Sequence, residues 1–356
     1  MFFELLKSFF ISKTDAFGFD YNFLVYRSIV CFCFSFLITF FVLKFLINTF
    51  KKHKFFQPIR LTSFQHFKSK KNIPTFGGLA CCLGIFISTL LFSNLNEYIV
   101  FSLFISAIFA FIGLIDDILK TIFHNTDGVD GKIKIVVETI MCGLAILFLS
   151  KYDTNLFTKT YIFIPFFHYM LYLGILMIPF LILIIIGSSN AVNLTDGLDG
   201  LAIVPIILCA LSFFIVLIYN DNMYSPISFD IKELSTLCSS IIGSGLAFLM
   251  FNRYPAKIFM GDVGSLMYGS LLGCIAIISG YEIFYGIIGL VFVLEAMSDM
   301  GQFISINVFH KRLFKIAPLH HTFEEYGWSE RKIVYTFWIF TLICVLIGIL
   351  GVIKIG

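Results

Sequence analysis

Long apolar runs dominate this sequence and restrict it to very few kinds of fold. Hydrophobic residues make up 59% of the 356 residues, and only 13% are charged. A soluble chain of this length cannot bury so much apolar surface, whereas about 20 consecutive apolar residues are enough to cross a bilayer. The sequence therefore predicts a polytopic integral membrane protein. Because nothing large remains between the runs, we expect residues 1–356 to form a single integral membrane domain.

About ten runs have roughly the length of a membrane span. They cover residues 24–50, 75–93, 97–115, 133–150, 166–187, 201–219, 236–251, 263–280, 282–306 and 333–353. The expected fold class is all-α, with about ten transmembrane helices. Most of the 25 Lys and Arg residues follow odd-numbered runs, and basic loops stay in the cytoplasm. We therefore predict that both termini are periplasmic.

Secretion and disulfide signals are missing from the sequence. Residues 1–11 carry Glu4 and Lys7 and show no small-residue cleavage pattern, so we expect no cleavable signal peptide. The nine cysteines are scattered through the apolar runs without a Cys-x-x-Cys pair. We expect them to be free thiols packed within helices.

A polar, acidic and glycine-bearing stretch separates two apolar runs at residues 190–200, which read Asn-Ala-Val-Asn-Leu-Thr-Asp-Gly-Leu-Asp-Gly. If it is helical, Asn193, Asp196 and Asp199 form one polar stripe. Carboxylate and amide oxygens without thiol or imidazole suit a hard cation such as Mg²⁺, or sugar hydroxyls. The same residue types also belong to an ordinary capped turn, so this stretch alone leaves both interpretations open.

Paired acids and a glycine-flanked acid lie on the same predicted cytoplasmic face. Asp116 and Asp117 end an apolar run, and Lys120 follows one helical turn later. They fit either a solvated helix end with an i, i+4 ion pair or a pair that handles metal or phosphate. Asp262 precedes another apolar run, where an aspartate is either a helix cap or part of a ligand site. Phe259 nearby could stack on a flat base or simply pack on a neighbour.

Histidines and lysines complete this face. His320 and His321 follow Pro318 in a basic loop, where imidazole can act as an acid or base or bind phosphate. Zinc is disfavoured because no Cys or third His stands at ligand spacing. The basic stretch 51–71 either attracts anionic lipid headgroups or steers a nucleotide-bearing anion.

These groups together suit phosphoryl transfer between two anionic substrates, one soluble and one a lipid held between helices. The chain has no Walker A loop, which argues against an ATPase. An ion-coupled transporter is a more distant alternative, because it would place its carboxylates at mid-membrane and not at one edge.

The ordered set of motifs resembles the phospho-N-acetylmuramoyl-pentapeptide transferase family of bacterial membrane enzymes. The matching segments are Gln57–Arg60, Pro74–Gly78, Gly113–Asp117, Asn190–Gly200, Asn252–Ala256, Phe259–Ser265, Ala317–His321 and Gly327–Trp328. The resemblance covers the chain from about residue 51 to its end. It implies transfer of phospho-N-acetylmuramoyl-pentapeptide from UDP to undecaprenyl phosphate, giving lipid I and UMP, with Mg²⁺, in the bacterial inner membrane.

The resemblance also implies roles for individual residues. Its catalytic set would be Asp116, Asp117, Asp262, His320 and His321, and its metal ligands Asp262, Asp117 and Asp196. Its substrate-binding set would be Lys71, Thr75, Lys120, Lys132, Asn190, Asn193, Asp196, Asp199, Asn252 and Phe259. The alignment of Lys132, as against Lys134, is left open by the acids inserted before it. The family further implies membrane lipid contacts and a homodimer, with no nucleic acid partner.

Two features bear on which branch of the superfamily this is. A sister family transfers N-acetylhexosamine 1-phosphate from a UDP-sugar to the same lipid phosphate and would share the acidic loops. The segment 318–324, Pro-Leu-His-His-Thr-Phe-Glu, favours the muramoyl-pentapeptide family, although Thr322 stands where that family usually has a third histidine.

Overall fold

Helix α11 (Asp262–Ser279) lies at the centre of a helical bundle, and every residue after Asp262 in it is buried. Helices α3 (Gly77–Phe92), α4 (Glu97–Thr121), α7 (Met177–Thr195) and α8 (Ile203–Tyr219) pack against it. The computed structural model describes the chain except for residues 1–15, 54–72, 126–127, 150–159, 220–228 and 353–356.

Glycines set how closely the neighbours approach the first turn of α11. A Cβ atom added at Gly78 would lie 2.3 Å from the Cα of Gly264, and one at Gly113 would lie 2.4 Å from the carbonyl oxygen of Asp262. Small residues allow such close packing of helices within membranes. The start of α11 is therefore held directly against the backbones of α3 and α4.

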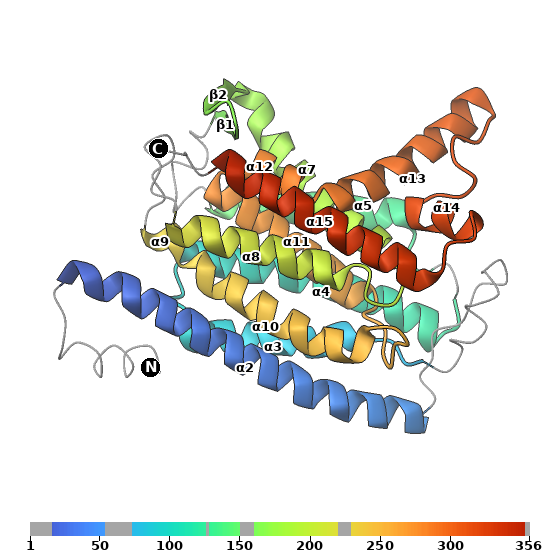
Figure 1. Ribbon diagram of the computed structural model, residues 1–356, viewed down its shortest axis with the longest axis horizontal. Coiled ribbons are helices and arrows are strands. Elements are labelled where there is room, and N and C mark those ends of the chain that lie inside the picture. Colours follow the sequence, from blue (N-terminus) through green and yellow to red (C-terminus); the bar gives the residue numbers. More distant parts are fainter. Residues whose placement is uncertain (1–15, 54–72, 126–127, 150–159, 220–228, 353–356) are drawn as a thin grey trace.

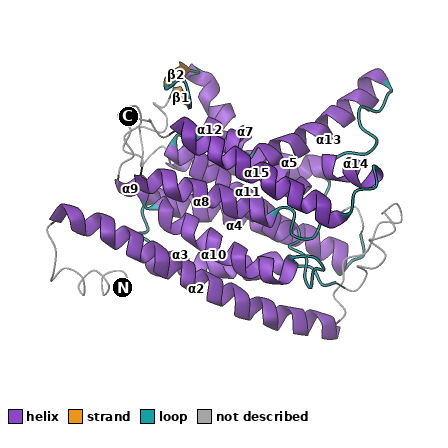
Figure 2. Cartoon of the chain, viewed as in Figure 1, coloured by secondary structure: helices purple, strands orange, loops and turns teal. Residues whose placement is uncertain are grey.

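The remaining helices surround this core (Figures 1 and 2). Helices α2 and α10 pack against each other along one side of the bundle, and α5 and α15 flank other parts of it. Their bounds, with those of the shorter helices, are α2 Ala16–His53, α5 Gly131–Leu149, α9 Phe229–Lys232, α10 Leu234–Asn252, α12 Glu282–Ile288, α13 Leu290–Phe309, α14 Leu319–Glu325 and α15 Glu330–Val352.

Helices long and apolar enough to cross a membrane confirm a multi-pass membrane protein. Among the described residues there are six, or seven if the bent pair α12–α13 counts as one span. Helices α3 and α8 are apolar but shorter. Most of the predicted runs thus correspond to helices, while the predicted figure of about ten spans is not established by their lengths. All nine cysteines are free thiols, as expected.

Two local features differ from the all-α expectation. Strands β1 (Tyr161–Ile164) and β2 (Tyr169–Tyr172) form an antiparallel hairpin, and β2 lies where the run 166–187 predicted helix. Helix α7 begins only at Met177, after a 3₁₀ turn, η2 (Gly174–Leu176). Aromatic and β-branched residues make up all of β1, and tyrosines form both ends of β2, which favours this pairing. The run 282–306 is also not one helix, because α12 and α13 meet at an angle of 83° on either side of Gly289.

The two ends of the bundle differ in chemistry. Figure 1 shows the first residues of α2 and the last residues of α15 at one end, and the α4–α5, α7–α8 and α10–α11 connections at the other. At the first end, the guanidinium of Arg27 donates to both carboxylate oxygens of Glu233, at 2.5 and 2.8 Å, and to the carbonyl of Phe92 at 3.1 Å. This buried pair ties α2 to the segment before α10. The polar motifs gather at the opposite end.

Candidate active site

Three carboxylates meet where the end of α4 reaches the start of α11. Asp116 and Asp117 are buried in α4, and Asp262 is the first residue of α11. One oxygen from each lies within 4.8 Å of the other two. The Asp117 carboxylate accepts hydrogen bonds from the backbone N–H groups of Asp262 and Val263, both at 3.1 Å. Asp117 therefore caps α11 from another helix, which brings the acids together.

Gly261 makes this cap possible. It has a φ of +76°, and a Cβ atom there would lie 2.4 Å from an Asp117 oxygen and 3.0 Å from the Thr75 hydroxyl. Thr75 is fully buried, and its hydroxyl has no hydrogen-bond partner among the described residues. A polar atom in this position is available to a ligand at the acidic cluster.

Asp262 is held by side chains from three other helices. Lys120 of α4 lies 3.1 Å from its Oδ2 and also forms an ion pair with Asp116, and Lys134 of α5 lies 3.4 Å from the same Oδ2. Asn193 of α7 donates to its Oδ1 at 3.0 Å. Three carboxylates against two ammonium groups leave the cluster with one net negative charge.

Lys134, and not the predicted Lys132, reaches the acids. Lys132 is exposed, and its backbone N–H donates to Asp130. Lys134 is buried at 9% exposure. Two residues along a helix point to nearly opposite faces, so only one of these lysines can face the cluster. The i, i+4 spacing of Lys134 and Glu138 was the sequence signal that could have selected it.

These two lysines provide a matched pair of variants. We expect Lys134→Gln to lower the activity of the site roughly 10- to 100-fold, because it removes a charged group bonded to a residue of the acidic cluster. Lys132→Gln should change activity less than about threefold, since surface substitutions away from a site have small effects. Initial rates of product formation measure both. Equal losses in the two variants would contradict the assignment of Lys134.

The stretch 190–200 is helical only in its first half. Helix α7 ends at Thr195, and the chain then turns, so the conditional stripe of Asn193, Asp196 and Asp199 is not formed. The side-chain amide of Asn190 donates to the Glu138 carboxylate of α5 at 2.8 Å. Asp199 is buried, and its Oδ2 accepts the Ala256 N–H at 2.9 Å.

Asp196 lies at the C-terminal end of α7 and is half-buried. Enclosure by the protein, and then the negative charges of Asp262 and Asp117, raise the pKa of the Asp196 carboxyl. It is close enough to the cluster to feel its charge, but the three mutually close carboxylates are Asp116, Asp117 and Asp262. Of the three metal ligands expected from the resemblance, Asp117 and Asp262 belong to this cluster and Asp196 does not. The third carboxylate of the cluster is Asp116.

Three other predicted substrate residues have different surroundings. Asn252 is buried and bridges two loops, since it accepts from the Gly200 N–H at 2.9 Å and donates to the Ile258 carbonyl at 3.0 Å. The Phe259 side chain is half-exposed, and its backbone pairs with Pro74 and Gly77. Lys71 lies outside the described residues.

The two histidines lie on α14 and are held by different carboxylates. His320 is buried at 1% exposure, and its Nδ1 lies 2.9 Å from Glu295, which also accepts the His320 N–H at 3.1 Å. His321 Nδ1 lies 2.6 Å from Glu324. The His320 Nε2 is buried and has no hydrogen-bond partner among the described residues. This atom faces Gly197, where an added Cβ would lie 2.3 Å away.

Glu295 was not predicted from the sequence. It is fully buried in α13, and a carboxylate inside the apolar run 282–306 was the available signal. Thr322, in place of the usual third histidine, donates to the Ile316 carbonyl and closes the preceding loop.

We expect Glu295→Gln to lower activity about tenfold or more, because the amide no longer fixes the His320 ring as a carboxylate does. Ser298→Ala is the matched control. The Ser298 hydroxyl accepts the Leu319 N–H at 3.1 Å and donates to the backbone carbonyl of Glu295 at 2.7 Å, so it also joins α13 to α14 but leaves the Glu295 carboxylate in place. Steady-state kinetics should show a fall in kcat for Glu295→Gln only. A similar fall in both variants would indicate that Glu295 merely attaches the two helices.

Comparison with known proteins identifies the family. A family model described as glycosyl transferase family 4 matches residues 99–280. A phospho-N-acetylmuramoyl-pentapeptide-transferase of Orientia tsutsugamushi (strain Ikeda) is 43% identical over 361 aligned residues, covering 98% of this chain and 99% of that protein. The chain belongs to the phospho-N-acetylmuramoyl-pentapeptide-transferase family.

Further members of the family show the same extent of similarity. The relative from Pelagibacter ubique (strain HTCC1062) is 43% identical over 85% of this chain and 86% of its own length. The relative from Rickettsia bellii (strain OSU 85-389) is 42% identical over 92% and 93%, respectively. The range matched by the family model contains the three clustered carboxylates, Lys120 and Lys134.

Proposed function

We propose that this protein transfers phospho-N-acetylmuramoyl-pentapeptide from its UDP-linked donor to undecaprenyl phosphate, giving lipid I and UMP. This is the first membrane step of peptidoglycan synthesis, and it places the protein in the bacterial inner membrane. The observation that carries the proposal is the near-full-length similarity to transferases of that name, combined with the buried acidic cluster.

A divalent cation, Mg²⁺, fits the residues at the cluster. Asp116, Asp117 and Asp262 offer hard oxygen ligands within 4.8 Å of one another, and their net negative charge with the two lysines favours a cation. When bound, Mg²⁺ neutralises phosphate oxygens and orients the reacting groups. The nearby unpartnered Thr75 hydroxyl adds a further polar contact for it or for substrate.

The protein's own side chains have distinct tasks in this proposal. Lys120 and Lys134 lie at the cluster and attract the diphosphate of the donor. One of the paired acids, Asp116 or Asp117, accepts the proton of the lipid phosphate. Asn193 fixes the orientation of Asp262 through its 3.0 Å hydrogen bond. His320 presents Nε2 toward the turn after α7, where Asp196 begins the polar loop.

The arrangement in the membrane also belongs to the proposal. The acidic cluster lies at the ends of α4 and α11, at the bundle end opposite to the start of α2 (Figure 1). We assign this end to the cytoplasm, with both termini periplasmic and about ten spans, so that the soluble donor meets the lipid at the membrane edge. Position at helix ends supports a transferase over an ion-coupled transporter.

UMP release tests the reaction. Purified protein in detergent is given undecaprenyl phosphate, Mg²⁺ and either UDP-N-acetylmuramoyl-pentapeptide or UDP-N-acetylglucosamine. We expect release with the pentapeptide donor alone. Release only with the second donor would assign the protein to the sister activity, and release with neither in folded protein would refute the transferase assignment.

A further inference from the structure

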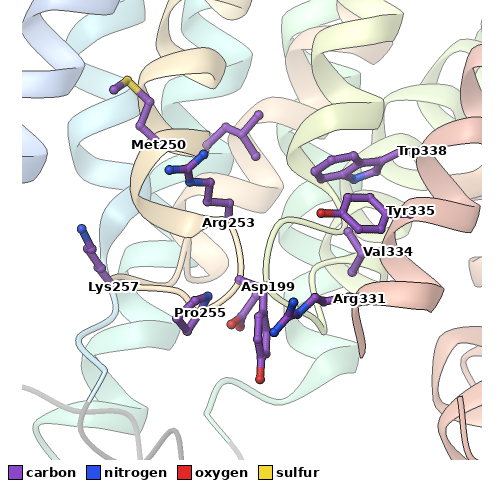
Figure 3. Close-up of a pocket in the computed structure, with 11 residues that line it drawn as sticks. Asp199, Met250, Arg253, Pro255, Lys257, Arg331, Val334, Tyr335 and Trp338 are labelled. Carbon is purple, nitrogen blue, oxygen red and sulfur yellow. The ribbon is translucent and has the colours of Figure 1, made fainter. Parts of the chain in front are cut away.

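A cleft at the polar end of the bundle lies apart from the acidic cluster. It has a volume of about 540 Å³ and opens between the end of α10 and the start of α15 (Figure 3). Both helices pack against α8, which begins only at Ile203. At the polar end of the bundle, α10 and α15 extend past the first residue of α8. No part of α8 fills the space between them there, and this leaves the cleft. None of the three clustered carboxylates lines it.

The walls of this cleft are fixed by contacts at its floor. Trp338 of α15 donates its indole N–H to the Gly200 carbonyl at 3.0 Å. A Cβ atom added at Gly200 would lie 3.5 Å from Trp338 and 3.8 Å from Leu249 of α10. The same turn therefore touches both helices, so the cleft is largely preformed.

Its lining changes from apolar to basic along its length. Leu249, Met250, Val334 and Trp338 lie on the helices, and Arg253, Lys257 and Arg331 lie at the helix ends, with the Arg253 side chain running back beside Met250 (Figure 3). Met250 is 50% exposed, so the apolar part opens to the outside of the bundle. This order matches a molecule with a hydrocarbon chain and an anionic head.

Aromatic side chains lie beside the basic groups. The Arg331 guanidinium stands 4.9 Å from the centre of the Tyr254 ring, and Tyr335 also lines the cleft. Tyr and Trp favour the headgroup level of a bilayer, and α10 and α15 are both candidate membrane spans. These residues are therefore suited to the membrane–water boundary.

The charge of the cleft is positive. Asp199 is its one lining carboxylate; it is 3% exposed, and its Oδ2 already accepts the Ala256 N–H. No described carboxylate forms an ion pair with Arg253, Lys257 or Arg331. Basic pockets between membrane helices on the cytoplasmic side bind anionic lipid headgroups.

We propose that this cleft binds one anionic phospholipid, with the phosphodiester near Arg253, Lys257 and Arg331 and an acyl chain against Met250 and Trp338. The lipid is a bound component of the membrane and not a reactant. The proposal therefore does not depend on which sugar donor the protein uses. It does depend on the helix ends lying at the membrane boundary.

Native mass spectrometry of the full-length protein tests this site. The protein is mixed with phosphatidylglycerol or with phosphatidylcholine of the same acyl chains. We expect one retained phosphatidylglycerol, and the double variant Arg253→Gln/Arg331→Gln should reduce its affinity roughly 30-fold, from about 1 kcal/mol for each basic group. The control variant Lys311→Gln/Arg312→Gln removes two exposed charges from the segment after α13, outside the cleft. It should leave the retention of phosphatidylglycerol unchanged.

A competition experiment distinguishes a site for a phospholipid from a site for a soluble phosphate ester. Millimolar glycerophosphoglycerol, which is the phosphodiester head without the acyl chains, should not displace the retained lipid. Displacement of the lipid would contradict the proposal and would show that the cleft binds soluble phosphate esters. Undiminished retention in the Arg253/Arg331 variant, or an equal loss in the Lys311/Arg312 variant, would overturn the proposal. Thermal unfolding confirms that each variant is folded before its retention is compared.

Discussion

Asp262→Asn is expected to lower transferase activity by roughly 100-fold or more, since loss of a group that merely orients metal ligands already costs about 10–100-fold. The substitution keeps the side-chain shape and the oxygen that accepts from Asn193. It removes the negative charge that Lys120 and Lys134 share. UMP release at saturating Mg²⁺ measures the effect.

The Mg²⁺ dependence of thermal unfolding provides a second measurement, which does not require turnover. Mg²⁺ should raise the Tm of the wild-type protein, because a ligand that binds only the folded state stabilises it. A chelator should reverse this rise, and Asp262→Asn should abolish it. Comparable turnover of the variant and the wild type, or an unchanged Mg²⁺ effect on Tm, would remove Asp262 from the metal site.

Gly113→Ala is expected to destabilise the protein by about 1–3 kcal/mol and to lower activity, although it adds only a methyl group. That methyl group would lie 2.4 Å from the Asp262 carbonyl oxygen, which belongs to the backbone at the start of α11. Helices α4 and α11 must therefore separate, which also separates Asp117 from the N–H groups that it caps. Thermal unfolding and UMP release measure the two consequences.

Gly187→Ala is the matched control for this effect. Gly187 lies within α7, and an added Cβ there would meet no atom within 4 Å. Alanine should leave stability unchanged or raise it by up to about 1 kcal/mol, because it favours helix over glycine. A Gly113→Ala protein as stable and active as Gly187→Ala would show that α4 and α11 tolerate separation.

The acids of the site could be predicted from the sequence because polar residues at the ends of apolar runs are costly in a membrane and therefore informative. Asp262 lies far along the chain from the adjacent pair Asp116 and Asp117, yet each of the three lies where an apolar run begins or ends. Helices that cross the same membrane bring such residues to one of two levels. The structure confirms that these three meet.

Rotation about a helix axis was harder to predict than position along it. Lys132 and Lys134 occupy almost the same level of α5, but only Lys134 faces the acids. Apolar runs do not specify which face of a helix is inward when both lipid and protein interiors are apolar. The β1–β2 hairpin was missed for a related reason, because short apolar strands and apolar helices have similar composition.

The sequence predicted which polar residues gather near the site, but it did not predict which groups their side chains contact. Asp199 lies in a polar loop and Asn252 is the last residue of α10, but the side chains of both satisfy backbone groups of neighbouring turns. The carboxylate that holds His320 was missed because Glu295 lies inside an apolar run, away from the motifs. Tertiary partners of this kind follow from how helices pack, which single-sequence patterns do not encode.

The 83° bend at Gly289 gives α13 a mechanical connection to the chemistry. Glu295 lies in the second turn of α13, and its carboxylate forms hydrogen bonds with both the backbone N–H and the ring Nδ1 of His320. The angle between α12 and α13 thus sets where the imidazole stands, while the carboxylates on α4 and α11 keep their positions. Because the acids lie on α4 and α11 and the histidine is attached to α13, any change in this angle would move the imidazole relative to the acids.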